Sequence, residues 1–279
     1  MSEKKELLRP VARIEPRRRL ALVDLRALWR FRDLWLAFAA RDLKVRYKQT
    51  VLGGLWAILQ PLTAMVLFTL VFGRLARMPS DNLPYPLFAY AGLLPWMFFA
   101  AIVNGASLSL VDSSRLLTKV YFPRLLVPTS VVGYALVDFA LGFLILVGLM
   151  LYYGVHPGLR ALAAPLPVLG IMATGLGAGV LLSALNAKYR DFRFVVPFLV
   201  QIWLFATPII YPASLIPERY RWIASLNPMS GLTECFRAAL LDTPLDWRHL
   251  AVSTAAGAAL LVIGLVYFGL VEDELADVI

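Results

Sequence analysis

Three basic residues near the N-terminus have the spacing of an anion-binding surface. Arg41, Lys44 and Lys48 lie at i, i+3 and i+7, so on a helix they share one face. Such a face can bind a phosphate or diphosphate group through charge-assisted hydrogen bonds. It can also face water or the headgroups of anionic lipids, and the residues alone leave both interpretations open.

The sequence offers no arrangement for catalysis or metal binding that we can support. Its two histidines, His156 and His249, have no His, Cys or carboxylate at a metal-ligand spacing, and Cys235 is the single cysteine. Glu218 and Glu234 have no obvious partner. A Walker-type phosphate loop is absent, because the dipeptide Gly-Lys never occurs. Any ATP that drives this protein must therefore be bound by another subunit.

Asp138 is the one carboxylate deep within a long apolar stretch. A charge at the centre of a bilayer costs roughly 2.5 to 3.5 kcal/mol, so such residues face protein or water. Asp138 can be a proton or cation site, or a structural carboxylate bonded to a neighbouring Tyr, Ser or Arg. We favour the structural interpretation, because the other apolar stretches contain no second acid or base to continue a proton relay.

The elements that position these residues are membrane helices. The 279-residue chain is 60% hydrophobic and 16% charged, with a mean hydropathy of +0.72, whereas soluble domains are about 45 to 50% apolar and about 25% charged. A membrane helix needs about 20 predominantly apolar residues. We predict an all-α integral membrane protein whose six spans lie near residues 51–73, 88–111, 125–153, 165–186, 194–212 and 250–271.

The basic residues orient these spans. Residues 1–50 contain 14 Lys or Arg and 6 Asp or Glu, which is +8 of the formal net charge of +9. With a cytoplasmic N-terminus, the inner segments hold 20 Lys or Arg and the outer segments hold 7, as the positive-inside rule requires. We therefore predict cytoplasmic termini and three parts: a basic N-terminus (1–50), a transmembrane domain (51–271) and a short acidic tail (272–279). Nucleic acid is not needed to explain the positive charge.

Two segments do not fit a plain six-helix bundle. Residues 20–48 mix basic residues with Leu and Trp in the amphipathic pattern of a helix that lies in the headgroup region. Residues 213–248 contain an uncharged run too short to span, which suggests a re-entrant or interfacial hairpin with turns at Pro217 and Pro228. Gly175 and Gly179 form a GxxxG pair, which we expect to serve packing within the subunit more than a dimer contact.

The loop at 112–128, DSSRLLTKVYFPRLLVP, contains the adjacent aromatics Tyr121 and Phe122. Two exposed aromatics on a short cytoplasmic loop suggest that they dock onto a partner. They can equally anchor the next span at the interface, and the residues do not decide between the two.

Four stretches resemble the signature sequences of ABC-2 type permeases, and most closely the polysaccharide exporters that move lipid-linked O antigen, capsular polysaccharide or teichoic acid. The resemblance runs from about residue 30 to the C-terminus. The stretches are RYKQTVLGGLWAILQPL (46–62), KVYFPRLLVP (119–128), YRDFRFVVPFLVQIWLFATPIIYP (189–212) and NPMSGLTECFRAALL (227–241).

The resemblance implies a homodimer in the bacterial inner membrane, paired with two copies of a separate ATPase that binds ATP and Mg²⁺. This chain itself would bind no cofactor and no metal. The candidate site residues form four groups. They are the ATPase-coupling helix (Arg115, Lys119, Tyr121, Phe122, Pro123, Arg124), the lipid-diphosphate and gate face (Arg41, Lys44, Lys48), channel aromatics (Trp56, Phe68, Phe72, Trp96, Phe99, Trp203) and a re-entrant outer gate (Pro228, Glu234, Arg237).

Three other functions remain open. An ABC-2 permease could export a small amphipathic drug or lipid with the same architecture. A membrane-embedded glycan-modifying enzyme would need placed acids or bases in an outer loop, and a channel or carrier would work without an ATPase.

Overall fold

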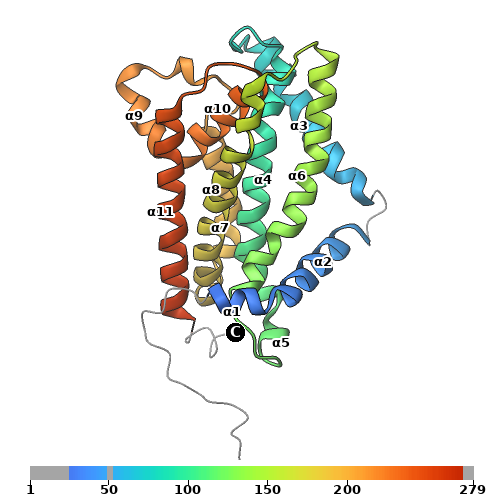
Figure 1. The fold of residues 1–279 in the computed structure, drawn as a ribbon, viewed down its shortest axis with the longest axis vertical. Helices are drawn as coiled ribbons and strands as arrows, with labels where there is room; N and C mark the ends of the chain where they lie inside the picture. Colours follow the sequence, from blue (N-terminus) through green and yellow to red (C-terminus); the bar gives the residue numbers. More distant parts are fainter. Residues whose placement is uncertain (1–24, 49–52, 273–279) are drawn as a thin grey trace, which may run out of the picture.

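The computed structural model describes residues 25–48 and 53–272, and every regular element in these ranges is helical (Figure 1). The basic residues before Leu25, the predicted boundary at 50/51 and the acidic tail from 273 lie outside the described residues. The helices are α1 (Leu25–Arg30), α2 (Arg32–Lys48), α3 (Trp56–Phe68), α4 (Tyr85–Asp112), α5 (Ser114–Leu117), α6 (Leu126–Tyr152), α7 (Pro165–Lys188), α8 (Phe192–Ala206), α9 (Glu218–Leu226), α10 (Pro228–Leu240) and α11 (Trp247–Val271). Shorter helical turns are η1 (Gly53–Leu55), η2 (Thr69–Leu75), η3 (Leu159–Ala163) and η4 (Ala213–Leu215).

Five helical segments in the described residues are long and apolar enough to cross a membrane, so the chain is a multi-pass membrane protein. They agree with five of the six predicted spans. Two of them join a helix to a shorter turn: α3 continues into η2, and η3 leads into α7. The segments are Trp56–Leu75, Tyr85–Asp112, Leu126–Tyr152, Leu159–Lys188 and Trp247–Val271.

The fifth predicted span, near 194–212, is helical over only part of its length. The helix α8 has 15 residues and ends at Ala206, and residues 207–212 are not helical. Pro208 and Pro212 explain the end, because proline lacks an amide donor and disfavours helical backbone in the residue before it.

The helix α4 forms the core of the bundle. It packs against α6, α7 and α8, and α11 packs against the opposite side of α7 (Figure 1). Glycines allow these close contacts. A Cβ atom at Gly179 would lie 2.7 Å from Ala106 of α4, and one at Gly177 would lie 2.5 Å from the backbone nitrogen of Leu261 in α11. The glycine-rich segment therefore packs within the subunit, as expected.

The two ends of the bundle differ in their elements. The helices α1 and α5 lie at the end where α11 finishes, and α2 runs obliquely from that end along α6 (Figure 1). The helices α9 and α10 lie at the opposite end. The N-terminal helices and the 112–124 loop therefore share one end, as the predicted topology requires.

Candidate functional site

The basic face of α2 points away from the bundle. Arg41, Lys44 and Lys48 are exposed, while Phe38 and Ala39 are buried on the other side of the helix. The Arg41 guanidinium lies 5.1 Å from the centroid of the Phe38 ring and 2.8 Å from the Asp42 carboxylate. The three predicted cations thus remain exposed, and Arg41 is already paired with the Asp42 carboxylate.

A fourth cation of α2, which sequence reasoning did not single out, points into the bundle. Arg46 Nη2 lies 3.0 Å from Oδ2 of Asp138 in α6, and its guanidinium lies 5.0 Å from the centroid of the Tyr134 ring. The Tyr47 hydroxyl donates a hydrogen bond to Oδ1 of Asp138. Burial, followed by the effect of Asp138, raises the pKa of Tyr47 to about 12, so the hydroxyl keeps its proton. Asp138 is therefore bonded to Arg46 and Tyr47, as the structural interpretation expects.

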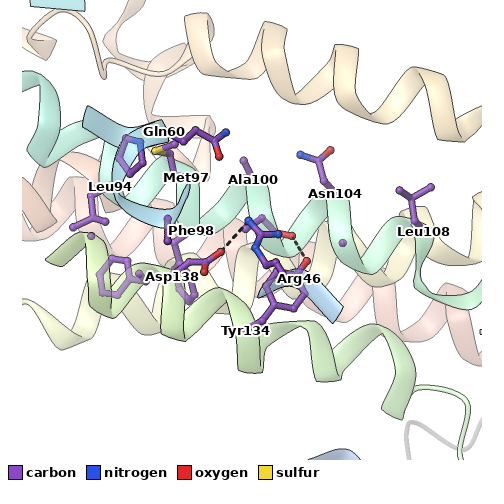
Figure 2. Close-up of a pocket in the computed structure, with 16 residues that line it drawn as sticks. Arg46, Gln60, Leu94, Met97, Phe98, Ala100, Asn104, Leu108, Tyr134 and Asp138 are labelled. Carbon is purple, nitrogen blue, oxygen red and sulfur yellow. Dashed lines mark hydrogen bonds and ion pairs between the residues drawn. The ribbon is translucent and has the colours of Figure 1, made fainter. Parts of the chain in front are cut away.

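This ion pair borders a cavity of about 380 Å³ between α2, α3, α4 and α6, whose mainly apolar wall carries several polar groups. Gln60 and Asn104 add amide groups to its lining, and Phe98 and Phe139 add aromatic rings (Figure 2). The Asn104 Oδ1 atom is buried and has no hydrogen-bond partner among residues 25–48 and 53–272. A buried acceptor without a partner is costly unless water or a ligand satisfies it.

The two aromatics of the 112–124 loop have different environments. Tyr121 is 88% exposed, whereas Phe122 is 4% exposed and its ring centroid lies 5.3 Å from that of Phe38 in α2. The expectation that both rings are exposed is wrong for Phe122, which joins a buried cluster between the loop and α2.

The other coupling-loop candidates surround this contact. Arg115 and Lys119 are exposed, and Pro123 is half-buried. Arg124 donates a hydrogen bond from Nη1 to the carbonyl oxygen of Glu272, which follows α11. The loop is thus attached to two elements of its own subunit and leaves Tyr121, Arg115 and Lys119 accessible.

The six aromatic channel candidates also divide by burial. Trp96 and Phe99 are buried in the core of the subunit, and Phe99 packs edge-to-face on Trp203 at 4.9 Å, so these two rings offer little surface to a glycan. Trp56 is exposed, and the half-buried Phe68 and Phe72 pack edge-to-face. Trp56, Phe68, Phe72 and the half-buried Trp203 remain candidates.

Arg237 of α10 supports the end of α8. Its Nη2 atom donates to the carbonyl oxygen of Ile209 at 3.0 Å and lies 3.5 Å from that of Pro208. Its guanidinium lies 3.8 Å from the centroid of the Phe88 ring. Burial lowers the pKa of Arg237 to about 10, so the side chain is charged at pH 7. A buried cation thus satisfies backbone carbonyls of the non-helical segment that follows α8.

The remaining outer-gate candidates lie near this contact. Pro228 begins α10, and the preceding Asn227 accepts hydrogen bonds from the Met229 amide and from Trp203 Nε1. Glu234 Oε2 lies 3.0 Å from His249 Nδ1, a pair that sequence spacing did not reveal. In the part of the chain that the structure describes, no group of three His, Cys, Asp or Glu is arranged to hold a metal.

Comparisons with known proteins agree with this architecture. The sequence model of the ABC-2 type transporter family matches residues 33–241. The chain is 34% identical over 240 residues to the O-antigen export system permease protein RfbA of Myxococcus xanthus, covering 85% of this chain and 92% of that protein.

Two further relatives are more distant. The RfbA protein of Klebsiella pneumoniae, also named an O-antigen export system permease protein, is 28% identical over 88% of this chain and 95% of its own length. The polysialic acid transport protein KpsM of Escherichia coli is 24% identical over 74% of this chain and 80% of its own length. The family match covers well over half of the chain, and the chain therefore belongs to the ABC-2 type transporter family.

Proposed function

We propose that this chain is the membrane-spanning permease of an ATP-driven exporter that moves a lipid-linked polysaccharide across the bacterial inner membrane. O antigen, capsule and teichoic-acid chains are the candidate cargoes. One observation supports this most strongly: relatives that align over 80 to 95% of their own length are named for O-antigen export or polysialic acid transport.

The complex that we propose contains two copies of this chain and two copies of an ATPase that binds ATP and Mg²⁺. The ATPase docks on the 112–124 loop, where Tyr121, Arg115 and Lys119 are accessible. Because Phe122 packs on Phe38 of α2, movement of the loop is transmitted directly to the helix that bears the basic face.

The proposed topology keeps both termini in the cytoplasm. The basic residues of 1–50 support this orientation. In this topology α8 and the non-helical residues 207–212 together make the fifth crossing, which is acceptable where irregular backbone is buried in protein. The α9–α10 hairpin then re-enters the membrane from the outer side, and Pro228, Glu234 and Arg237 belong to this outer gate.

The transport cycle begins when the lipid diphosphate binds the Arg41, Lys44 and Lys48 face of α2. Closure of the ATPase dimer displaces the 112–124 loop and α2, and the glycan passes outward between the two permease subunits. Trp56, Phe68, Phe72 and Trp203 are the aromatics proposed to contact it.

The test is complementation of a deletion strain together with purification of the complex from native membranes. We expect surface polysaccharide to disappear in the deletion strain and to return with the wild-type gene, and we expect a co-purifying ATPase and a glycolipid identified by mass spectrometry. An ATPase activity stimulated by amphipathic drugs and not by glycolipid would instead indicate a drug or lipid exporter. Chemical change of the glycan without transport would indicate a modifying enzyme.

A further inference from the structure

We propose that the cavity between α2, α3, α4 and α6 binds an uncharged sugar ring. This inference rests on the proposed function, because it takes the ring to be part of the lipid-linked glycan. The site is distinct from the basic face of α2, because Arg41, Lys44 and Lys48 are not among the residues that line this cavity.

The cavity has several polar groups in a mainly apolar wall, although it lies among membrane helices. Gln60 belongs to the segment Trp56–Leu75, Asn104 to Tyr85–Asp112 and Asp138 to Leu126–Tyr152, each of which is apolar enough to span. Polar residues at such depth usually face a functional cavity. The Asn104 Oδ1 atom, buried and without a partner in the described ranges, is an acceptor that a ligand hydroxyl can satisfy.

The charges of the site favour an uncharged ligand. Arg46 is the cation that lines the cavity, and the Asp138 carboxylate 3.0 Å away balances its charge. A phosphate that approached Arg46 would also approach this carboxylate, and like charges repel. A hydroxyl group has no such conflict, because it can accept from Arg46 or the Gln60 amide and donate to Asp138 or Asn104.

The aromatic walls favour a ring. Phe139 is half-buried and lines the cavity. Its ring centroid lies 5.0 Å from that of Phe98, which also lines the cavity but is only 2% exposed and therefore mainly supports the Phe139 ring. The negative face of an aromatic ring attracts the C–H groups of a sugar, while the sugar hydroxyls point toward polar neighbours. The volume of about 380 Å³ lies at the small end of the usual range for ligand sites, which suits one short segment of a glycan.

The test uses the full-length chain in lipid nanodiscs and two amphiphiles of equal chain length, octyl β-glucoside and octyl phosphate. Binding is followed by saturation-transfer NMR below the micelle concentration, with empty nanodiscs correcting for partition into lipid. We expect the wild type to bind the glucoside more tightly than the phosphate. Asn104→Leu and Gln60→Leu should each weaken glucoside binding about tenfold, since each removes a hydrogen-bonding amide.

The control is Gln201→Leu, the same change on α8 at an exposed position that does not line the cavity, and it should bind the glucoside as the wild type does. Gln60 is exposed on α3, so its variant keeps the test valid if Asn104→Leu does not fold. Tighter binding of octyl phosphate, or unchanged glucoside binding in Gln60→Leu and in a folded Asn104→Leu, would overturn the inference.

Export in the complemented deletion strain separates this inference from the proposed function. If the wild type restores surface polysaccharide but neither substitution changes glucoside binding, the cavity is not a sugar site and the proposed function stands. If the wild type restores no polysaccharide, the proposed function fails, and glucoside binding that depends on Asn104 and Gln60 would still establish the site.

Discussion

Arg46 Nη2 and Asp138 Oδ2 lie 3.0 Å apart and join α2 to the middle of α6. The Asp138 side chain is 18% exposed and that of Arg46 is 44% exposed, so the pair is only partly buried. Loss of one partner leaves the other partner's charge uncompensated among apolar helices. Replacement of both partners by apolar residues leaves no charge to compensate. The ion pair thus helps to hold α2 on α6, together with the Tyr47–Asp138 hydrogen bond and the contact of Phe38 with Phe122.

We expect Asp138→Leu to destabilise the chain by about 1 to 2 kcal/mol, less than for a fully buried pair because Arg46 is partly solvated. The double variant Arg46→Met/Asp138→Leu should recover the part of this loss that comes from the unpaired Arg46 charge, while the Tyr47 hydroxyl still lacks its Asp138 acceptor. Thermal unfolding of the purified full-length chain in detergent measures both. Equal destabilisation in the single and the double variant would show that the ion pair does not determine this stability.

Tyr121 and Phe122 should respond differently to alanine. Tyr121→Ala removes an exposed ring, so the unfolding temperature should stay unchanged, while co-purification of the ATPase should decrease. Phe122→Ala should lower the free energy of unfolding by about 3 kcal/mol, because it removes a buried aromatic from the cluster with Phe38. Undiminished ATPase binding by Tyr121→Ala would contradict the docking role.

The sequence predicted the helices well because long apolar segments have few alternatives in lipid. It could not tell Trp56 from Trp96, since a membrane protein has apolar residues both on its lipid-facing surface and in its core. Trp56 is exposed and Trp96 is buried, and only the packing of α3 and α4 against the rest of the bundle distinguishes them.

Two polar contacts between helices could not be predicted from the sequence. Arg46 with Asp138, and Glu234 with His249, lie far apart in the sequence, so no local spacing reveals them. Pro208 marks the end of α8 in the sequence. The prediction of a span there rested on hydropathy, and hydropathy takes no account of the backbone donor that proline lacks. The sequence therefore predicts which segments are helical better than it predicts which distant residues contact each other.

The close packing of α7 on α11 predicts that a larger residue at the contact destabilises the chain. Gly177→Ala should destabilise the chain by about 1 to 3 kcal/mol, because its new methyl group would collide with the Leu261 backbone. Gly269→Ala is the matched control, since no atom lies within 4 Å of a Cβ there, and it should be neutral or stabilising by up to about 1 kcal/mol. Both are measured by thermal unfolding, and an equal effect of the two would contradict this packing.

Charge reversal on the basic face of α2 tests the lipid-diphosphate site. Arg41→Glu and Lys44→Glu should each reduce the stimulation of ATPase activity by glycolipid, because each places a carboxylate where the diphosphate binds. Arg219→Glu makes the same charge change on α9 at the opposite end of the bundle and should leave stimulation unaffected. If the α2 variants respond to glycolipid as the wild type does, the diphosphate binds elsewhere.

Arg237 should control the order of the segment that follows α8. Arg237→Met removes the donor to the Ile209 and Pro208 carbonyls, and each carbonyl left buried and unpaired costs about 1 to 3 kcal/mol. We therefore expect faster labelling of a Ser214→Cys reporter by a membrane-impermeant maleimide, with little background from the buried Cys235. Arg237→Lys keeps the charge but lacks the planar fork of donors, so its labelling rate should lie between those of Arg237→Met and the wild type. Identical rates in all three would mean that α9 and α10 hold this segment without the guanidinium.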